Sequence, residues 1–79
     1  MTKHHLNATR LLCPLPVIRV QDRVRDLAPG EQLEVVCTDP GVLQDIPAWC
    51  RINGHRVLET RRDPAEGTII LLVEVGGGA

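Results

Sequence analysis

Aromatic residues and an excess of positive charge are both missing from this sequence. It has one Trp and no Phe or Tyr, so it lacks the side chains on which single-stranded nucleic acids usually stack. Nine Lys and Arg residues stand against ten Asp and Glu residues, whereas nucleic acids and anionic membranes are recognised largely through positive charge. These absences argue against a nucleic acid or a membrane as the main partner.

Long apolar runs and paired cysteines are missing as well. No run approaches the roughly 20 residues that span a bilayer, and no apolar segment of signal-peptide length follows the first residues. The three cysteines, at positions 13, 37 and 50, fit neither a disulfide framework nor paired zinc ligands. We therefore expect a cytoplasmic protein with reduced thiols and no bound metal.

The sequence does contain a large aliphatic fraction in a short chain. Leu, Ile and Val make up 24 of its 79 residues, a share above the roughly 20% that marks disordered chains. A chain of this length has room for one small hydrophobic core. We expect a single domain over residues 1–75 and a flexible tail over residues 76–79, because the final Gly-Gly-Gly-Ala has nothing to bury.

The first half of the sequence predicts a strand, a helix and a strand. Apolar residues recur at spacings of three and four over residues 14–28, which is typical of an amphipathic helix, and Pro29-Gly30 should end it. A weakly apolar strand over residues 4–8 precedes this helix, and a well-buried strand over residues 32–37 follows it. We expect the two strands to be parallel neighbours joined by the helix.

The second half predicts a helix and a hairpin. Thr38-Asp39-Pro40 places a capping side chain before a proline, which should start a helix, and Pro47 should divide that helix in two before Gly54 ends it. Strands over residues 57–61 and 68–75, with a five-residue loop between them, should form the hairpin. The resulting βαβαββ order implies an α/β fold, an α+β two-layer sandwich with two helices on one face of a four-stranded mixed sheet.

Cys13 is the residue best placed for chemistry. It directly precedes the first predicted helix, where Pro14 and Pro16 sacrifice no backbone hydrogen bond because the first N–H groups of a helix have no intrahelical acceptor. The N–H groups of Leu15 and Val17 would remain unpaired, and the positive end of the helix dipole would face the sulfur. We expect both to lower the pKa of the Cys13 thiol. A buried or capping thiol without a chemical role is the alternative.

The other cysteines indicate what kind of reaction Cys13 can perform. Position 16 is not a cysteine, so the chain lacks a Cys-x-x-Cys dithiol, and a lone activated cysteine suits the transfer of a single group. Cys37 ends a predicted strand and Cys50 lies inside a predicted helix. We expect both to pack in the core.

Several motifs occur together along nearly the whole chain. They are Leu6-Asn7-Ala8-Thr9-Arg10-Leu11-Leu12-Cys13-Pro14-Leu15-Pro16, Pro29-Gly30-Glu31, Thr38-Asp39-Pro40, Asp45-Ile46-Pro47-Ala48-Trp49-Cys50 and Gly54-His55. In order and spacing they resemble the TusA-like (SirA-like) sulfur carriers. The resemblance implies a two-layer sandwich whose signature cysteine, here Cys13, carries a persulfide without a cofactor. It also implies a cysteine desulfurase or rhodanese-like donor, and an acceptor relay feeding tRNA thiolation, molybdenum cofactor synthesis or sulfur oxidation.

Two positions depart from the pattern of that family. Asn7 stands where the family usually has Asp, and Arg10 stands where it usually has Gly, three residues before the cysteine. If that position needs a positive φ, Arg10 is strained there. Its cation would alternatively favour the thiolate of Cys13. We expect a retained activity with an altered partner preference.

The predicted topology also indicates where a partner docks. Parallel first and second strands would bring Cys13 and the Asp39 loop to one edge of the sheet, where α/β sheets commonly place their sites. We expect charge reversal at Asp39 to weaken sulfur uptake and to leave the fold intact. The expected docking residues are Arg10, Pro14, Leu15, Pro16, Ile18 and Asp39.

Two other functions compete with sulfur transfer. A redox-sensing interaction module would use the same Cys13, oxidised to sulfenic acid or a mixed disulfide. A ubiquitin-like carrier would use a C-terminal Gly-Gly thiocarboxylate, but Ala79 follows Gly77-Gly78 and the order of helices and strands suits that class poorly. Sulfur transfer through Cys13 is therefore the leading interpretation.

Overall fold

A computed structural model describes residues 3–76 of the chain. The predicted order of four strands and two helices is confirmed. Gly76 donates its N–H to His55 Nδ1 at 2.9 Å, and the other residues of the predicted tail, 77–79, lie outside the described part. The elements are β1 (Lys3–Ala8), α1 (Leu15–Val24), β2 (Gln32–Cys37), α2 (Val42–Asn53), β3 (Arg56–Asp63) and β4 (Thr68–Glu74).

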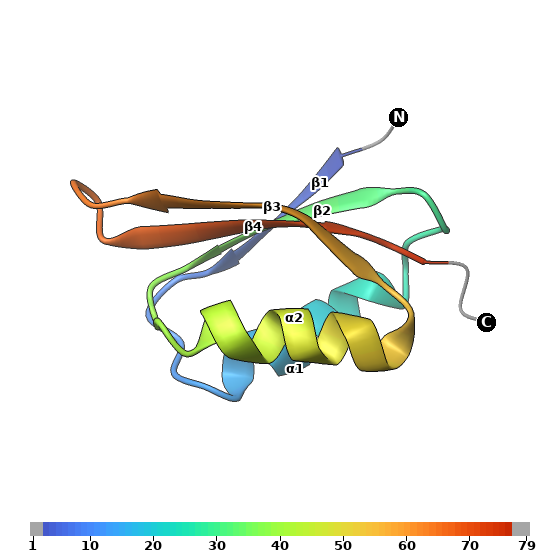
Figure 1. Cartoon of the computed structure of the whole chain (residues 1–79), viewed down its shortest axis with the longest axis horizontal. Helices are drawn as coiled ribbons and strands as arrows, with labels where there is room; N and C mark the ends of the chain where they lie inside the picture. Colours follow the sequence, from blue (N-terminus) through green and yellow to red (C-terminus); the bar gives the residue numbers. More distant parts are fainter. Residues whose placement is uncertain (1–2, 77–79) are drawn as a thin grey trace.

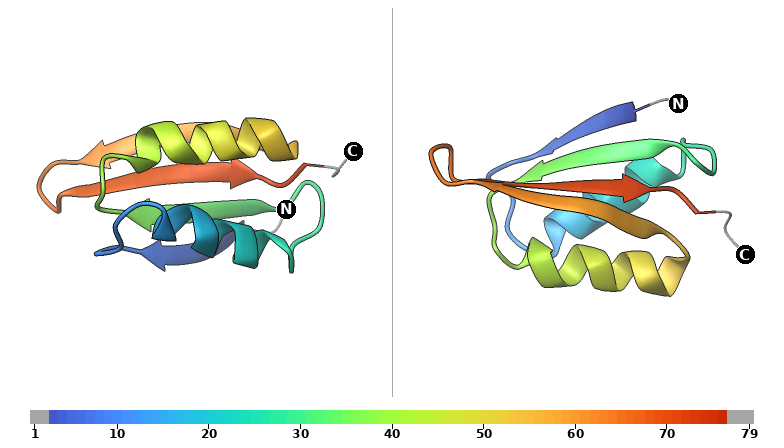
Figure 2. Two further views of the ribbon diagram at one scale, coloured as in Figure 1. Left: turned by 90° about the horizontal axis from the view of Figure 1, so that it is seen from below. Right: turned by 45° about the horizontal axis from the view of Figure 1, so that its top comes forward.

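The strands form one mixed sheet in the order β1-β2-β4-β3. β1 is parallel to β2, as predicted, and β4 is antiparallel to both β2 and β3. Both helices cover the same face of this sheet (Figure 1), with α1 lying over the β1–β2 side and α2 over the β3–β4 side (Figure 2). The structure is therefore the two-layer α+β sandwich that the sequence predicts.

The hydrophobic core lies between the sheet and the helices. Successive side chains of a strand point to opposite faces, so alternate residues of β2 and β4 face the helices and are buried. Cys37 and Cys50 are both buried in this core, as predicted. The buried residues of the sheet and the helices include Leu33, Val35, Leu71, Val73, Val20, Val24, Val42 and Ile46.

The predicted ends of α1 and β3 are wrong. α1 ends at Val24 instead of near residue 28, because the next residues form tight turns in which Leu27 donates its N–H to the Val24 carbonyl at 3.0 Å. Leu27 packs against the core from this turn. β3 is longer than predicted and extends to Asp63, which pairs with Thr68, so the hairpin loop has one residue fewer than expected.

α2 is one continuous helix although Pro47 lies inside it, so the predicted division at this proline is wrong. Proline removes one backbone hydrogen bond and crowds the preceding turn. Val42, Ile46 and Cys50 follow one another at helical spacing and are all buried. Their packing against the sheet stabilises the helix on both sides of the proline. Gly54 ends it at φ 81, as predicted.

No helix among residues 3–76 is long and apolar enough to cross a membrane.

Candidate functional site

Cys13 lies in the loop between β1 and α1, at the end of the sheet where the two parallel strands finish. Ala8 and Cys37, the last residues of β1 and β2, are paired, so the loops that leave these strands start side by side. The Arg10 N–H donates to Thr38 Oγ1 at 2.8 Å and ties the two loops together. The prediction that Cys13 and the Asp39 loop share one edge is confirmed.

Asp39 holds the Cys13 loop in place. Its Oδ2 accepts the N–H of Cys13 at 2.7 Å, and its Oδ1 accepts the N–H of Gly41 at 3.1 Å. These backbone hydrogen bonds lower the pKa of the Asp39 carboxyl. The predicted helix start at Thr38-Asp39-Pro40 is wrong, since α2 begins at Val42 with Gly41 as its N-cap. Charge reversal at Asp39 would disturb the Cys13 loop, so it is a poor test of docking.

The start of α1 differs from the prediction by one residue. The helix begins at Leu15, with Pro14 at the N-cap and Pro16 at the second helical position. The Leu15 N–H donates to the Leu12 carbonyl at 2.9 Å. The expectation that this N–H remains unpaired beside the sulfur is therefore wrong.

The sulfur of Cys13 contacts a carboxylate from the first turn of α2. Its thiol donates a hydrogen bond to Asp45 Oδ2. This hydrogen bond, partial burial and the negative charges of Asp45 and Asp39 raise the pKa of the Cys13 thiol to about 11. The expected lowering of this pKa is wrong, and the unloaded residue is a protonated thiol at neutral pH.

Asp45 is a residue of the site that sequence reasoning missed. Its only signal was its place in the motif Asp45-Ile46-Pro47, which suggested a family but no role for the carboxylate. The prediction for Cys13 considered the helix that follows it in the chain. The deciding group comes instead from a helix 32 residues away in the sequence.

Arg10 adopts the backbone conformation that glycine prefers. Its φ is 64°, which confirms that this position of the loop needs a positive φ. The side chain is exposed. Arg10 therefore occupies a strained position three residues before the cysteine.

Exposed apolar side chains flank Cys13 along the chain. Leu15 and Ile18, both expected at the docking surface, are nearly half exposed, and Leu12 is 73% exposed. Leu12 was missed because it lies in a loop, where no periodicity marks it. Pro14 is exposed, but Pro16 is buried, so the expected contact of Pro16 with a partner is wrong.

Known proteins are similar to this sequence over most of its length. A family model described as Sulfurtransferase TusA matches residues 4–75. The chain belongs to the TusA family. "Sulfur carrier protein TusA" of Pseudomonas paraeruginosa is 47% identical over 58 residues, which cover 73% of this chain and 73% of that protein.

Two further relatives match the TusA-family chain. "Sulfur carrier protein TusA" of Pseudomonas putida is 45% identical over 58 residues, covering 73% of this chain and 72% of that protein. "Putative sulfur carrier protein YrkF" of Bacillus subtilis is 42% identical over 65 residues, which cover 82% of this chain but 34% of that protein. The match to YrkF therefore concerns one part of a longer protein.

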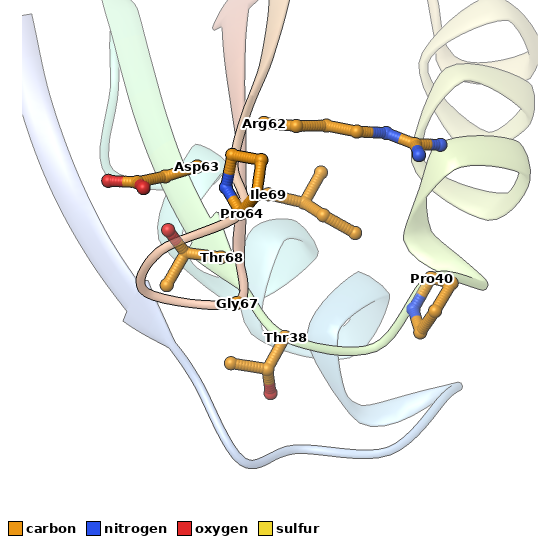
Figure 3. A pocket seen from close by; sticks show the side chains of 8 residues that line it. All are labelled: Thr38, Pro40, Arg62, Asp63, Pro64, Gly67, Thr68 and Ile69. Carbon is orange, nitrogen blue, oxygen red and sulfur yellow. The ribbon is translucent and has the colours of Figure 1, made fainter.

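A shallow cleft of about 250 Å³ lies at the same end of the TusA-family chain. Figure 3 shows the β3–β4 hairpin on one side of it and the loop after β2 on the other, with Arg62 extending toward α2. Cys13 does not line this cleft, so the sulfur lies outside it. The lining residues are Thr38, Pro40, Arg62, Asp63, Pro64, Gly67, Thr68 and Ile69.

His, Cys, Asp and Glu side chains do not gather into a metal site in the part of the chain that the structure describes: no group of three or more is placed to hold a metal ion. Asp39 and Asp45 instead contact the backbone and the thiol of Cys13.

Proposed function

We propose that this chain is a sulfur carrier in which Cys13 receives a sulfur atom from the persulfide of a donor protein and passes it to an acceptor protein. The family match over residues 4–75 includes the Cys13 motif, and the partly exposed thiol lies at an edge of the sheet. The position of this thiol beside exposed apolar residues is the observation that carries the proposal.

The transfer is a thiol exchange in which the Cys13 thiolate attacks the outer sulfur of the donor's persulfide. A bond forms between Cys13 Sγ and that sulfur, and the donor's S–S bond breaks. The electron pair of the broken bond leaves with the donor as a thiolate, while the transferred sulfur keeps its proton as Cys13–S–SH. An acceptor thiolate then attacks the outer sulfur, and Cys13 leaves as a thiolate that takes up a proton. The exchange needs no cofactor.

Proteins are the partners that this surface fits best. Exposed apolar side chains beside a reactive group are typical of a protein-docking surface, and Leu12, Leu15 and Ile18 provide them, with the exposed Arg10 and Pro14 nearby. We propose a cysteine desulfurase or a rhodanese-like protein as donor. The acceptor is a relay protein feeding tRNA thiolation, molybdenum cofactor synthesis or sulfur oxidation, in the cytoplasm, where thiols stay reduced.

The redox-sensing alternative has less support. Cysteines that sense oxidants are accessible and have a low pKa, whereas the thiol of Cys13 has its pKa raised to about 11. The alternative of a C-terminal thiocarboxylate concerns Gly77 and Gly78, which lie outside the described residues.

The first prediction concerns sulfur loading of Cys13. After incubation with a cysteine desulfurase, its pyridoxal phosphate and cysteine, we expect the wild-type chain to gain about 32 Da, the mass of one sulfur, and to lose it again with a reductant. Intact-protein mass spectrometry measures this gain. Cys13→Ala should gain nothing, because Cys37 and Cys50 are buried.

Equal loading of wild type and Cys13→Ala would contradict the proposal, since the sulfur would then reside elsewhere in the chain. Loading with a rhodanese-like donor but not with a desulfurase would retain the proposal and identify the donor class. A wild-type chain that takes up sulfur from neither donor, yet forms sulfenic acid with peroxide, would favour the redox sensor.

A further inference from the structure

Asp45 has no part in the exchange described above, yet its carboxylate contacts the reacting sulfur. It lies in the first turn of α2, where its N–H donates to the Gly41 carbonyl at 3.0 Å. The helix thus fixes the backbone from which the carboxylate reaches the sulfur. Oδ2 of this carboxylate accepts the hydrogen bond of the Cys13 thiol.

The other ionisable groups near the sulfur act differently. Asp39, in the loop between β2 and α2, adds negative charge, but its two oxygens accept the N–H groups of Cys13 and Gly41. Cys37, on β2, is a buried thiol whose pKa is raised to about 11, first by burial and then by the charges of Asp39 and Cys13. Asp45 is therefore the one of these groups that contacts the thiol proton itself.

We propose that Asp45 holds the proton of the unloaded Cys13 and thereby suppresses the reaction of this thiol with small electrophiles. The inference deepens the proposed function and rests on it. The thiolate is the nucleophile of cysteine chemistry, so a thiol kept protonated by a carboxylate reacts slowly until a partner changes its surroundings.

The same contact affects the release of sulfur. Loading replaces the thiol proton with a sulfur atom, so Sγ no longer has a hydrogen to donate to Asp45. The hydrogen bond therefore stabilises the empty carrier and not the loaded one. Two carboxylates next to the site also disfavour a negatively charged persulfide. Both effects favour passing the sulfur on, which suits a relay.

The size of the suppression follows from two opposing effects. A thiol whose pKa is about 11 instead of 9.0 holds about 100-fold less thiolate at neutral pH. Its thiolate is intrinsically more nucleophilic, by about tenfold, because reactivity rises with basicity with a slope of about 0.4–0.5. Burial and the charge of Asp39 contribute part of this rise, so removing the Asp45 carboxylate should accelerate the reaction several-fold, with about tenfold as the upper bound.

The test is the pH dependence of Cys13 alkylation by iodoacetamide, followed by mass spectrometry of the peptide that contains Cys13. In Asp45→Asn we expect the midpoint of the pH–rate profile to fall and the rate near pH 7.5 to rise several-fold, by at most about tenfold. Asp26→Asn is the matched control, because it makes the same exchange at an exposed residue beyond the far end of α1. It should keep the wild-type profile.

An unchanged or slower reaction of Asp45→Asn would overturn the proposal. The wild-type profile is a second measurement that does not depend on the folding of a variant. A midpoint of the wild-type profile near pH 11 supports the proposal, and a midpoint at or below about pH 9 overturns it. Alkylation needs no donor, so this result is independent of whether Cys13 takes up sulfur.

Discussion

At the scale of single residues, Arg10 combines a charged side chain with a strained backbone. A left-handed backbone conformation costs a residue with a side chain on the order of 1 kcal/mol of folding free energy. Arg10 has this conformation, with φ 64°. Arg10→Gly would remove this strain at the cost of a more flexible unfolded chain. We expect the free energy of unfolding to rise by about 0.5–1 kcal/mol. The shift of the urea midpoint measures this change.

Arg10→Ala is the control for this prediction. It removes the guanidinium but keeps a Cβ, and therefore the strain, so its stability should stay close to that of the wild type. Equal stabilisation by Ala and by Gly would mean that the charge of Arg10, and not its backbone, is the source of the effect.

The residue scale also shows why one part of the site could be predicted and another could not. The position of Cys13 before a helix, and the positive φ at Arg10, depend on neighbours in the chain, which a motif records. The pKa of Cys13 depends on Asp45, which lies 32 residues away. The direction of the shift is set by where the Asp45 carboxylate lies relative to the sulfur, and no local pattern contains that information.

At the scale of elements, α2 shows the limit of local rules. Pro47 is a strong helix breaker in isolation, but the apolar residues on either side of it share one buried face. The strands could be predicted more closely, because Leu33, Val35 and Cys37 alternate in a way that only a half-buried strand explains. The extent of α2 depends on its packing against the sheet, and local sequence patterns do not record that packing.

This account of α2 predicts the effect of Pro47→Ala. Alanine would restore an N–H inside the helix and remove the crowding of the proline ring, although the unfolded chain becomes more flexible. We expect the free energy of unfolding to rise by about 1–2 kcal/mol, measured by urea denaturation. Pro47→Gly restores the same N–H but favours the helix less, so its gain should be smaller by about 1 kcal/mol. Destabilisation by alanine would mean that packing of the proline ring outweighs the lost hydrogen bond.

At the scale of the whole molecule, Cys13, the two carboxylates that contact it and the cleft all lie at one end. The first turns of α1 and α2, the ends of β1 and β2 and the β3–β4 hairpin all lie on the left in Figure 1. The parallel pairing of β1 with β2 produces this arrangement, since each strand delivers its following loop to the same edge. A partner that reaches Cys13 must therefore approach this end of the molecule.

Two exposed isoleucines test that conclusion directly. Ile18 is 44% exposed on α1, one turn after Pro14, whose carbonyl accepts its N–H at 3.2 Å. Ile52 is 81% exposed in the last turn of α2, at the opposite end of that helix from Asp45. Neither side chain belongs to the core, so Ile18→Lys and Ile52→Lys should both fold. The same substitution thus probes the two ends of the molecule.

We expect Ile18→Lys to slow sulfur uptake from the donor by about tenfold, because a charge would replace an apolar contact with the donor. A tenfold change corresponds to about 1.4 kcal/mol of docking free energy. Ile52→Lys should take up sulfur at the wild-type rate. Mass spectrometry of the loaded fraction over time measures both rates. Alkylation of each variant by iodoacetamide measures any effect of the added lysine charge on the Cys13 thiol itself, and the uptake rates are compared after correction for it. Equal slowing by both substitutions would contradict the conclusion that the donor docks at the end of the molecule that holds Cys13.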